Sequence, residues 1–235
     1  MQVPMPEAIS EEIVVVIPAY NEDGMVRQVV ESLLKQQIGT IIIVDDGSHV
    51  PVSHAVHGLP VIVLRHRVNL GQGAALQTAF AYAKKLAPSI VITFDADGQH
   101  DAGDIPAMIA PLQQNKADVV LGSRFLPGSG PSIGLSKKLV LQLARFINFL
   151  LSGALLSDAH NGYRALNRQA LEKIELTENR MAHASEILFE IRRHRLRFCE
   201  VPVHIRYTDY SKQKGQSAWD SVRILFDLVL HKLFK

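Results

Sequence analysis

Short runs of branched apolar residues alternate, along the first half of the chain, with segments whose apolar positions recur every three or four residues. The apolar runs cover residues 13–17, 40–44, 61–64, 90–94 and 118–121, and the segments with helical spacing cover residues 24–35, 74–86 and 105–114. Such alternation is typical of strands joined by helical crossovers. The pattern therefore predicts an α/β fold with one mainly parallel sheet.

The second half of the chain is less regular. Residues 126–138 are rich in Gly, Pro and Ser and predict a long loop, whereas residues 185–195 and 201–207 predict a helix and a strand. Residues 139–156 and 219–234 are apolar but are interrupted by polar side chains at helical spacing. They predict amphipathic helices rather than membrane spans, which need roughly 20 predominantly apolar residues. Each helix could pack on the core, on a second subunit or flat on a bilayer.

Size and composition fit one domain. The chain has 235 residues, of which 47% are hydrophobic, and we expect a domain over residues 1–217 followed by a C-terminal amphipathic helix over residues 218–235. The formal net charge of +2 does not indicate a nucleic-acid-binding protein. The single cysteine, Cys199, excludes an internal disulfide, and no signal peptide pattern opens the chain. We therefore expect a cytoplasmic location.

Polar residues follow the predicted strands, at the sheet edge where ligands bind in open α/β folds. Asp95 and Asp97 lie two positions apart after residues 90–94, so their carboxylates can converge on a divalent cation, with Gln99 adding a neutral oxygen. An isolated Asp-x-Asp is also a common solvated turn. Arg124 follows residues 118–121 and suits bidentate recognition of phosphate, although a surface ion pair would use the same side chain.

The turns after the first three strands predict a nucleotide site. Tyr20, Asn21 and Glu22 offer a stacking face and polar edges to a planar base. The carboxylate of Asp46 can accept hydrogen bonds from a ribose or a base, or it can simply form a turn. Gly73 precedes a predicted helix, where backbone N–H groups can approach phosphate, or where glycine merely starts the helix. The chain contains neither the Gly-x-Gly-x-x-Gly fingerprint nor a Gly-rich Lys-Ser/Thr loop.

A series of motifs runs from Ile13 to Ser217. In order, they are VVVIPAYNE, IIIVDDGS, NLGQGAAL, FDADGQH, VVLGSRF, DAHNGYRAL and EVPVHIRY…KGQS. In order and spacing this series resembles the family 2 glycosyltransferases of the dolichyl-phosphate mannosyltransferase type and their bacterial polyprenyl-phosphate relatives. The resemblance implies the GT-A fold, which is a single nucleotide-binding α/β domain with a Rossmann-like, mainly parallel sheet.

The resemblance also implies roles for individual residues. Pro18, Tyr20, Glu22 and Asp46 would hold the nucleoside, Asp95, Asp97 and Gln99 the metal and the diphosphate, and Arg124 a phosphate. Asp158 and Arg164 match the Asp-x-x-x-Gly-Tyr-Arg pattern on the acceptor side. Lys212 and Ser217 match the pattern Arg-x-x-Gly-x-Ser, except that Lys replaces the usual Arg and Ala218 stands where a Lys is common. We expect Lys212 and Lys214 together to supply the phosphate contact.

We therefore expect an inverting, Mg²⁺- or Mn²⁺-dependent hexosyltransferase. It would move a sugar from a UDP- or GDP-sugar to a polyprenyl phosphate, for cell-envelope polysaccharide, at the cytoplasmic face of the membrane. The amphipathic helices would contact lipid or a small membrane protein, and a homodimer is compatible with the sequence.

Two other functions stay open. An acceptor phosphate is largely anionic at neutral pH and needs no general base, whereas the hydroxyl of a sugar or a protein would need one. Asp158, and after it Glu186, are the candidates for that base. The third function is a catalytically weak scaffold that binds a nucleotide-sugar and serves a membrane partner.

Overall fold

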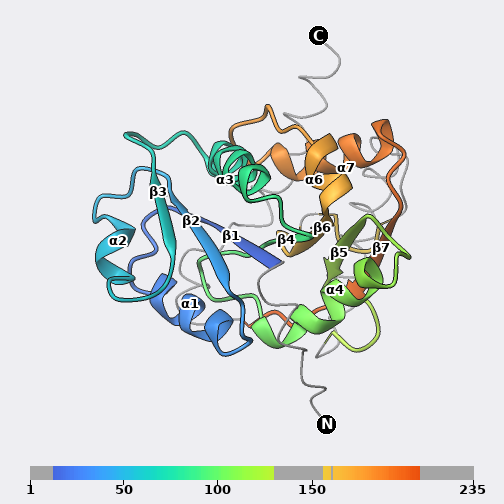
Figure 1. Cartoon of the computed structure of the whole chain (residues 1–235), viewed down its shortest axis with the longest axis horizontal. Helices are drawn as coiled ribbons and strands as arrows, with labels where there is room; N and C mark the ends of the chain where they lie inside the picture. The colour runs from blue at the N-terminus through green and yellow to red at the C-terminus, as the bar shows by residue number, and fades with distance from the viewer. Residues whose placement is uncertain (1–12, 130–155, 160, 207–235) are drawn as a thin grey trace, which may run out of the picture.

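The computed structural model describes residues 13–129, 156–159 and 161–206, which form one sheet covered by helices (Figure 1). The sheet has seven strands in the order β3-β2-β1-β4-β6-β5-β7. The strands are β1 (Ile13–Ala19), β2 (Thr40–Asp45), β3 (Ile62–Arg65), β4 (Ile90–Thr93), β5 (Val119–Ser123), β6 (Arg164–Asn167) and β7 (Phe198–Pro202). The helices are α1 (Val26–Leu34), α2 (Val52–Ala55), α3 (Gln72–Leu86), the 3₁₀ helix η2 (Ala102–Asp104), α4 (Ile105–Gln113), α6 (Arg168–Lys173) and α7 (His183–Arg193).

One strand runs against all the others. β1 pairs in parallel with β2 and β4, β2 with β3, and β5 with β7, whereas β6 is antiparallel to both of its neighbours, β4 and β5. The mainly parallel sheet is thus confirmed. Because β6 is reversed, its first residues meet the carboxyl ends of β4 and β5, so Arg164 lies opposite Thr93 and Leu121.

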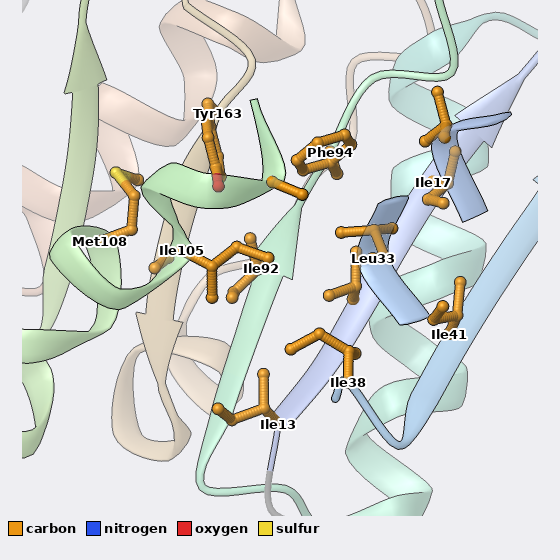
Figure 2. Close-up of a cluster of buried hydrophobic side chains, with 14 of the residues drawn as sticks. Ile13, Ile17, Leu33, Ile38, Ile41, Ile92, Phe94, Ile105, Met108 and Tyr163 are labelled. Carbon is orange, nitrogen blue, oxygen red and sulfur yellow. The ribbon is translucent and has the colours of Figure 1, made fainter. Parts of the chain in front are cut away.

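The alternation of side chains along β1 divides the core into two layers. Ile13, Val15 and Ile17 belong to a buried cluster with α1 and α4, and Val14 and Val16 belong to a second cluster with α3, α6 and α7. Figure 1 shows α1 and α4 below the sheet and α3, α6 and α7 above it. Figure 2 shows part of the first cluster, to which α1, α4 and the strands of the sheet contribute side chains. Burial on both faces explains why the strands appear in the sequence as continuous apolar runs.

The second half of the chain differs from the prediction. β6 and α6 were not expected, and the last strand covers Phe198–Pro202 rather than residues 201–207. The predicted helix 185–195 corresponds to α7, which begins two residues earlier at His183. Residues 130–155 and 207–235 lie outside the described residues, and with them most of the predicted loop and both amphipathic helices. None of the helices in the described part of the chain is long and apolar enough to span a bilayer.

Candidate active site

The residues that were expected to bind ligands follow the carboxyl ends of the parallel strands. Asp46 follows β2, Asp95 and Asp97 follow β4, and Arg124 follows β5. The reversed strand β6 brings a further segment, residues 161–163, to the same edge. The fold therefore gathers side chains that follow three strands, together with the segment before β6, at one edge of the sheet.

Asp95 is held from two sides. Its Oδ1 accepts a hydrogen bond from Gln72 Nε2, at the start of α3, with a distance of 3.1 Å. Its carboxylate packs on the α-carbon of Gly162, where a Cβ would lie 2.7 Å from Oδ2. The pKa of Asp95 rises to about 6 because burial disfavours the charged carboxylate, and the positive charges of Arg164 and Arg124 oppose that rise.

Asp97 is bound by its own loop. It accepts hydrogen bonds from the main-chain N–H of Gln99, at 2.9 Å, and from Gln99 Nε2, at 2.7 Å. The side chain of Gln99 was expected to coordinate a metal, but here its amide group donates to Asp97 and orients that carboxylate. Burial raises the pKa of Asp97, and the negative charge of Asp95 raises it further.

Asp95 and Asp97 lie close enough for the negative charge of Asp95 to disfavour ionisation of Asp97, and such a pair of carboxylates fits a divalent cation. The negative charge of Glu22 also acts on both of them, so the edge carries a concentrated negative charge. The described residues contain no group of three or more His, Cys, Asp and Glu side chains arranged to hold a metal ion. The two carboxylates suit a cation such as Mg²⁺, which binds through one or two carboxylates and completes its coordination with substrate phosphate oxygens and water.

His100 supports the loop that carries Asp95 and Asp97, a role that the sequence did not suggest. Its Nδ1 accepts a hydrogen bond from the main-chain N–H of Asp95, at 3.2 Å. Its ring stacks on Tyr163, with ring centroids 4.8 Å apart, and meets the edge of Phe94. Burial lowers the pKa of His100 to about 4, so the ring is neutral and Nε2 carries the proton. In the sequence, the only signal for this role of His100 was the presence of the aromatic residues Phe94 and Tyr163, which contact its ring in the structure.

Arg124 and Asp158 form a forked ion pair. Asp158 Oδ2 accepts from Arg124 Nε at 2.6 Å, Asp158 Oδ1 accepts from Arg124 Nη2 at 2.7 Å, and the main-chain N–H of Arg124 donates to Oδ2 at 3.1 Å. The aspartate side chain is 2% exposed and the arginine side chain is 32% exposed. The guanidinium is thus fixed in direction but still accessible, so the contact of Arg124 with phosphate stays a prediction.

Arg164 is placed differently from the expectation. The residue is 3% exposed, and its guanidinium donates to the carbonyl oxygens of Ala159, Asn161 and Ala184. Burial lowers its pKa to about 10, which leaves it charged at neutral pH. A contact between Arg164 and an acceptor phosphate does not fit this buried position. The positive charge of Arg164 instead favours the ionised form of Asp95.

Asp46 binds the loop between β3 and α3. Its carboxylate, which is 2% exposed, accepts hydrogen bonds from His66 Nδ1, Asn69 Nδ2 and the main-chain N–H groups of Leu70 and Gly71, over 2.7–3.0 Å. These four donors occupy both oxygens. The expected contact of Asp46 with a nucleoside stays a prediction, and any such contact competes with these bonds.

Gly73 has a packing role. A Cβ at this position would collide with the carbonyl oxygen of Glu178, and the next residue, Ala74, donates its main-chain N–H to Asn179 O at 3.0 Å. The glycine therefore lets the start of α3 contact the segment before α7. This explains the glycine without a phosphate, so the phosphate contact of Gly73 also stays a prediction.

The other expected nucleotide residues lie at the end of β1. Pro18 is part of that strand and pairs with Val44, whereas Tyr20 is 41% exposed just beyond the strand. Their contact with a nucleoside stays a prediction. Lys212, Lys214 and Ser217 lie outside the described residues.

Comparisons with known proteins place this chain in a family. The model of Glycosyl transferase family 2 matches residues 14–175. UDP-N-acetylglucosamine–dolichyl-phosphate N-acetylglucosaminyltransferase from Methanococcus voltae is 33% identical over 95% of this chain and 97% of its own length. Polyprenol monophosphomannose synthase from Mycolicibacterium smegmatis is 29% identical over 72% of this chain and 66% of its own length.

A solved structure supports the fold. Glucosyl-3-phosphoglycerate synthase from Mycobacterium tuberculosis, crystallised with Mn²⁺, UDP and glucosyl-3-phosphoglycerate, matches with a TM-score of 0.72 and 18% identity, over 99% of this chain and 84% of that chain. This match confirms the expected GT-A type of fold. The family model and the similarity to the Methanococcus voltae enzyme over nearly both full lengths show that this chain belongs to glycosyl transferase family 2.

Proposed function

We propose that this chain is an inverting glycosyltransferase that moves a sugar from a nucleotide-diphosphate sugar to a polyprenyl phosphate. The observation that carries the proposal is the pair Asp95 and Asp97, beside the forked Arg124, at the carboxyl edge of the sheet. Such an edge suits a diphosphate bound through a cation. The acceptor is proposed because the Methanococcus voltae relative is named for transfer to dolichyl phosphate.

In the proposed reaction, an oxygen of the acceptor phosphate bonds to the anomeric carbon while the bond from that carbon to the diphosphate breaks on the opposite face. Mg²⁺ or Mn²⁺, held by Asp95 and Asp97, would neutralise the charge that develops on the leaving diphosphate. Arg124 adds a positive charge, and Asp158 holds the guanidinium group that carries it in one orientation. Glu22 and Tyr20 would lie beside the nucleoside.

The candidates for a general base favour a phosphate acceptor over a hydroxyl. Both oxygens of Asp158 accept hydrogen bonds from Arg124. Both oxygens of Glu186 accept hydrogen bonds from the segment before α7, from Thr177 and Glu178. Both carboxylates are thus already held by donors of the protein, whereas an anionic phosphate reacts without a base. Transfer to a sugar or protein hydroxyl is therefore the less supported alternative.

The acceptor also implies a location. A polyprenyl phosphate lies in a membrane, so we place the protein at the cytoplasmic face as a peripheral protein. Residues 139–156 and 219–234, which the sequence predicts to be amphipathic helices, would contact lipid or a small membrane-protein partner. Lys212, Lys214 and Ser217 would lie near the phosphate of the acceptor.

Calorimetry tests the donor site directly. UDP, GDP and their common sugar conjugates are titrated into the full chain with Mg²⁺, with Mn²⁺ and with no divalent cation. We expect one nucleotide class to bind only with the cation, and we expect Asp97→Asn to abolish that binding. Asp118→Asn is the matched control, because Asp118 lies at the opposite end of the strand that leads to Arg124. A transfer assay with a short-chain polyprenyl phosphate then tests the acceptor.

The outcomes separate the functions. Cation-dependent binding together with transfer to the polyprenyl phosphate supports the proposal. Binding and transfer only to a sugar or protein hydroxyl would favour the second function. Binding without turnover on any acceptor, with unchanged cellular function of Asp97→Asn, would favour the scaffold.

A further inference from the structure

Glu200, on β7, accepts four hydrogen bonds from the loop that carries Asp158. Its Oε1 accepts from the main-chain N–H of Ser157 at 2.8 Å, from Ser157 Oγ at 2.7 Å and from the main-chain N–H of Asp158 at 3.1 Å. Its Oε2 accepts again from the N–H of Ser157, at 3.0 Å. Glu200 therefore holds two consecutive residues of this loop on β7.

The same loop is also tied to the end of β5. Ser157 Oγ lies 2.5 Å from Ser123 Oγ, in the buried interior, and Ser123 Oγ accepts the main-chain N–H of Phe125 at 3.1 Å. Arg124 lies between these two residues. The loop and the end of β5 are thus joined at two points, by the contact between Ser157 and Ser123 and by the ion pair between Asp158 and Arg124.

These bonds form a chain from β7 to the reactive edge. Glu200 fixes the main chain at Ser157 and Asp158, and Asp158 in turn fixes both the main-chain N–H and the guanidinium of Arg124. A carboxylate suits the first link because it accepts only and has about four lone-pair sites for the donors around it. A glutamine would present an N–H₂ group to N–H donors.

We propose that Glu200 is a positioning residue for sugar transfer, which directs the Arg124 guanidinium at the donor diphosphate through Asp158. The inference rests on the proposed function, since it takes the orientation of the Arg124 guanidinium to serve binding of the donor diphosphate. In this proposal Glu200 acts through its hydrogen bonds to Ser157 and Asp158 rather than through contact with the substrate. Its effect on rate comes from geometry, because a misplacement of about 1 Å in a catalytic group can cost about 100-fold in rate.

A double-mutant cycle tests the proposal. Steady-state transfer is measured for the full chain and for Glu200→Gln, Arg124→Ala and the double variant. We expect Glu200→Gln to lower kcat by about 10- to 100-fold while the donor KM changes by less than about threefold. In the Arg124→Ala background, the same change should cause no further loss. Asp118→Asn is the control, because it removes a carboxylate that Arg197 contacts at the far end of β5 and β7, and it should lower Tm without lowering kcat.

Two results would overturn the proposal. One is an equal loss of kcat from Glu200→Gln with and without Arg124, which would mean that the two residues act independently. The other is an unchanged kcat in Glu200→Gln.

A second measurement does not depend on turnover. If the wild-type chain transfers no sugar, the proposed function fails, and the structural link is read from hydrogen exchange at the amide of Arg124, which donates to Asp158. Faster exchange in Glu200→Gln, but not in Asp118→Asn, supports the link from Glu200 to Arg124. Unchanged exchange in Glu200→Gln refutes it.

Discussion

The carboxylate of Asp95 packs directly on the α-carbon of Gly162. A Cβ at residue 162 would lie 2.7 Å from Oδ2 and 2.9 Å from Oδ1 of Asp95, closer than Cβ atoms approach other heavy atoms. The contact follows from the sheet, because Thr93 in β4 pairs with Arg164 in β6, so that β4 ends and β6 begins at this edge. Glycine at residue 162 thus leaves room for a carboxylate that is proposed to bind the cation.

Gly162→Ala should therefore weaken cation-dependent nucleotide binding. Gly162 does not have a positive φ, so alanine fits its backbone and the main conflict is with Asp95. We expect the affinity for the nucleotide with Mn²⁺ to fall by at least about tenfold, which corresponds to about 1.4 kcal/mol. Calorimetry measures it, with Gly24→Ala as control because a Cβ there would meet nothing within 4 Å. Equal affinities for Gly162→Ala and the wild type would contradict the prediction.

The apolar runs in the sequence located five of the seven strands, β1 to β5, including the half-buried edge strand β3. β1, β2 and β4 appear as continuous apolar runs and were placed correctly. β6 has four residues and contains Arg164, a charged residue whose partners are main-chain carbonyls, so no apolar pattern marks it. β7 is an edge strand that begins with the half-exposed Phe198, and its position was predicted three residues too late.

The candidate site was predictable in position but not in its contacts. The rule that ligands bind at strand ends located Asp46, Asp95 and Arg124 at one edge. It could not show that the Asp46 carboxylate accepts hydrogen bonds from a loop more than 20 residues away in the sequence. Nor could it show that Asp158 pairs with Arg124 across 34 residues. Such pairs depend on the fold. The buried position of Arg164 was hidden for the same reason.

Arg164→Lys should destabilise the protein. The arginine donates to three carbonyl oxygens and so joins the segment before β6 to α7, and the ammonium group of lysine cannot span them. We expect the free energy of unfolding to fall by roughly 2–4 kcal/mol, measured by chemical denaturation. Arg193→Lys is the control, since Arg193 is exposed and pairs with Glu190 one turn away. Unchanged stability together with a raised KM for the acceptor would restore the original expectation that Arg164 contacts phosphate.

Asp118 should make stability depend on acid pH. Hydrogen bonds from Arg197 lower the pKa of Asp118 from 3.8 to about 2, so the folded state favours its ionised form. The resulting stabilisation is complete above pH 3.8 and is lost as the pH falls toward 2. Because Arg197 is half exposed, we expect only about 1 kcal/mol.

Thermal or urea unfolding at pH 6 and at pH 2.5 measures this contribution. The wild type should lose stability relative to Asp118→Asn as the pH falls between these values. A constant difference between the two proteins across this range would show that Asp118 has an ordinary pKa.

Asp46→Asn should distinguish two roles for this residue. The amide keeps one acceptor oxygen but places an N–H₂ group against donors such as Asn69 Nδ2 and the N–H of Gly71, so the loop before α3 should loosen. If Asp46 holds the loop, the variant without nucleotide should lose roughly 1–3 kcal/mol of stability, and Asn69→Ala should weaken nucleotide binding in the same direction. If Asp46 instead bonds mainly to the nucleoside, binding should weaken while the stability of the free protein stays unchanged and Asn69→Ala has no effect. Because four donors already occupy its carboxylate, we expect the first result.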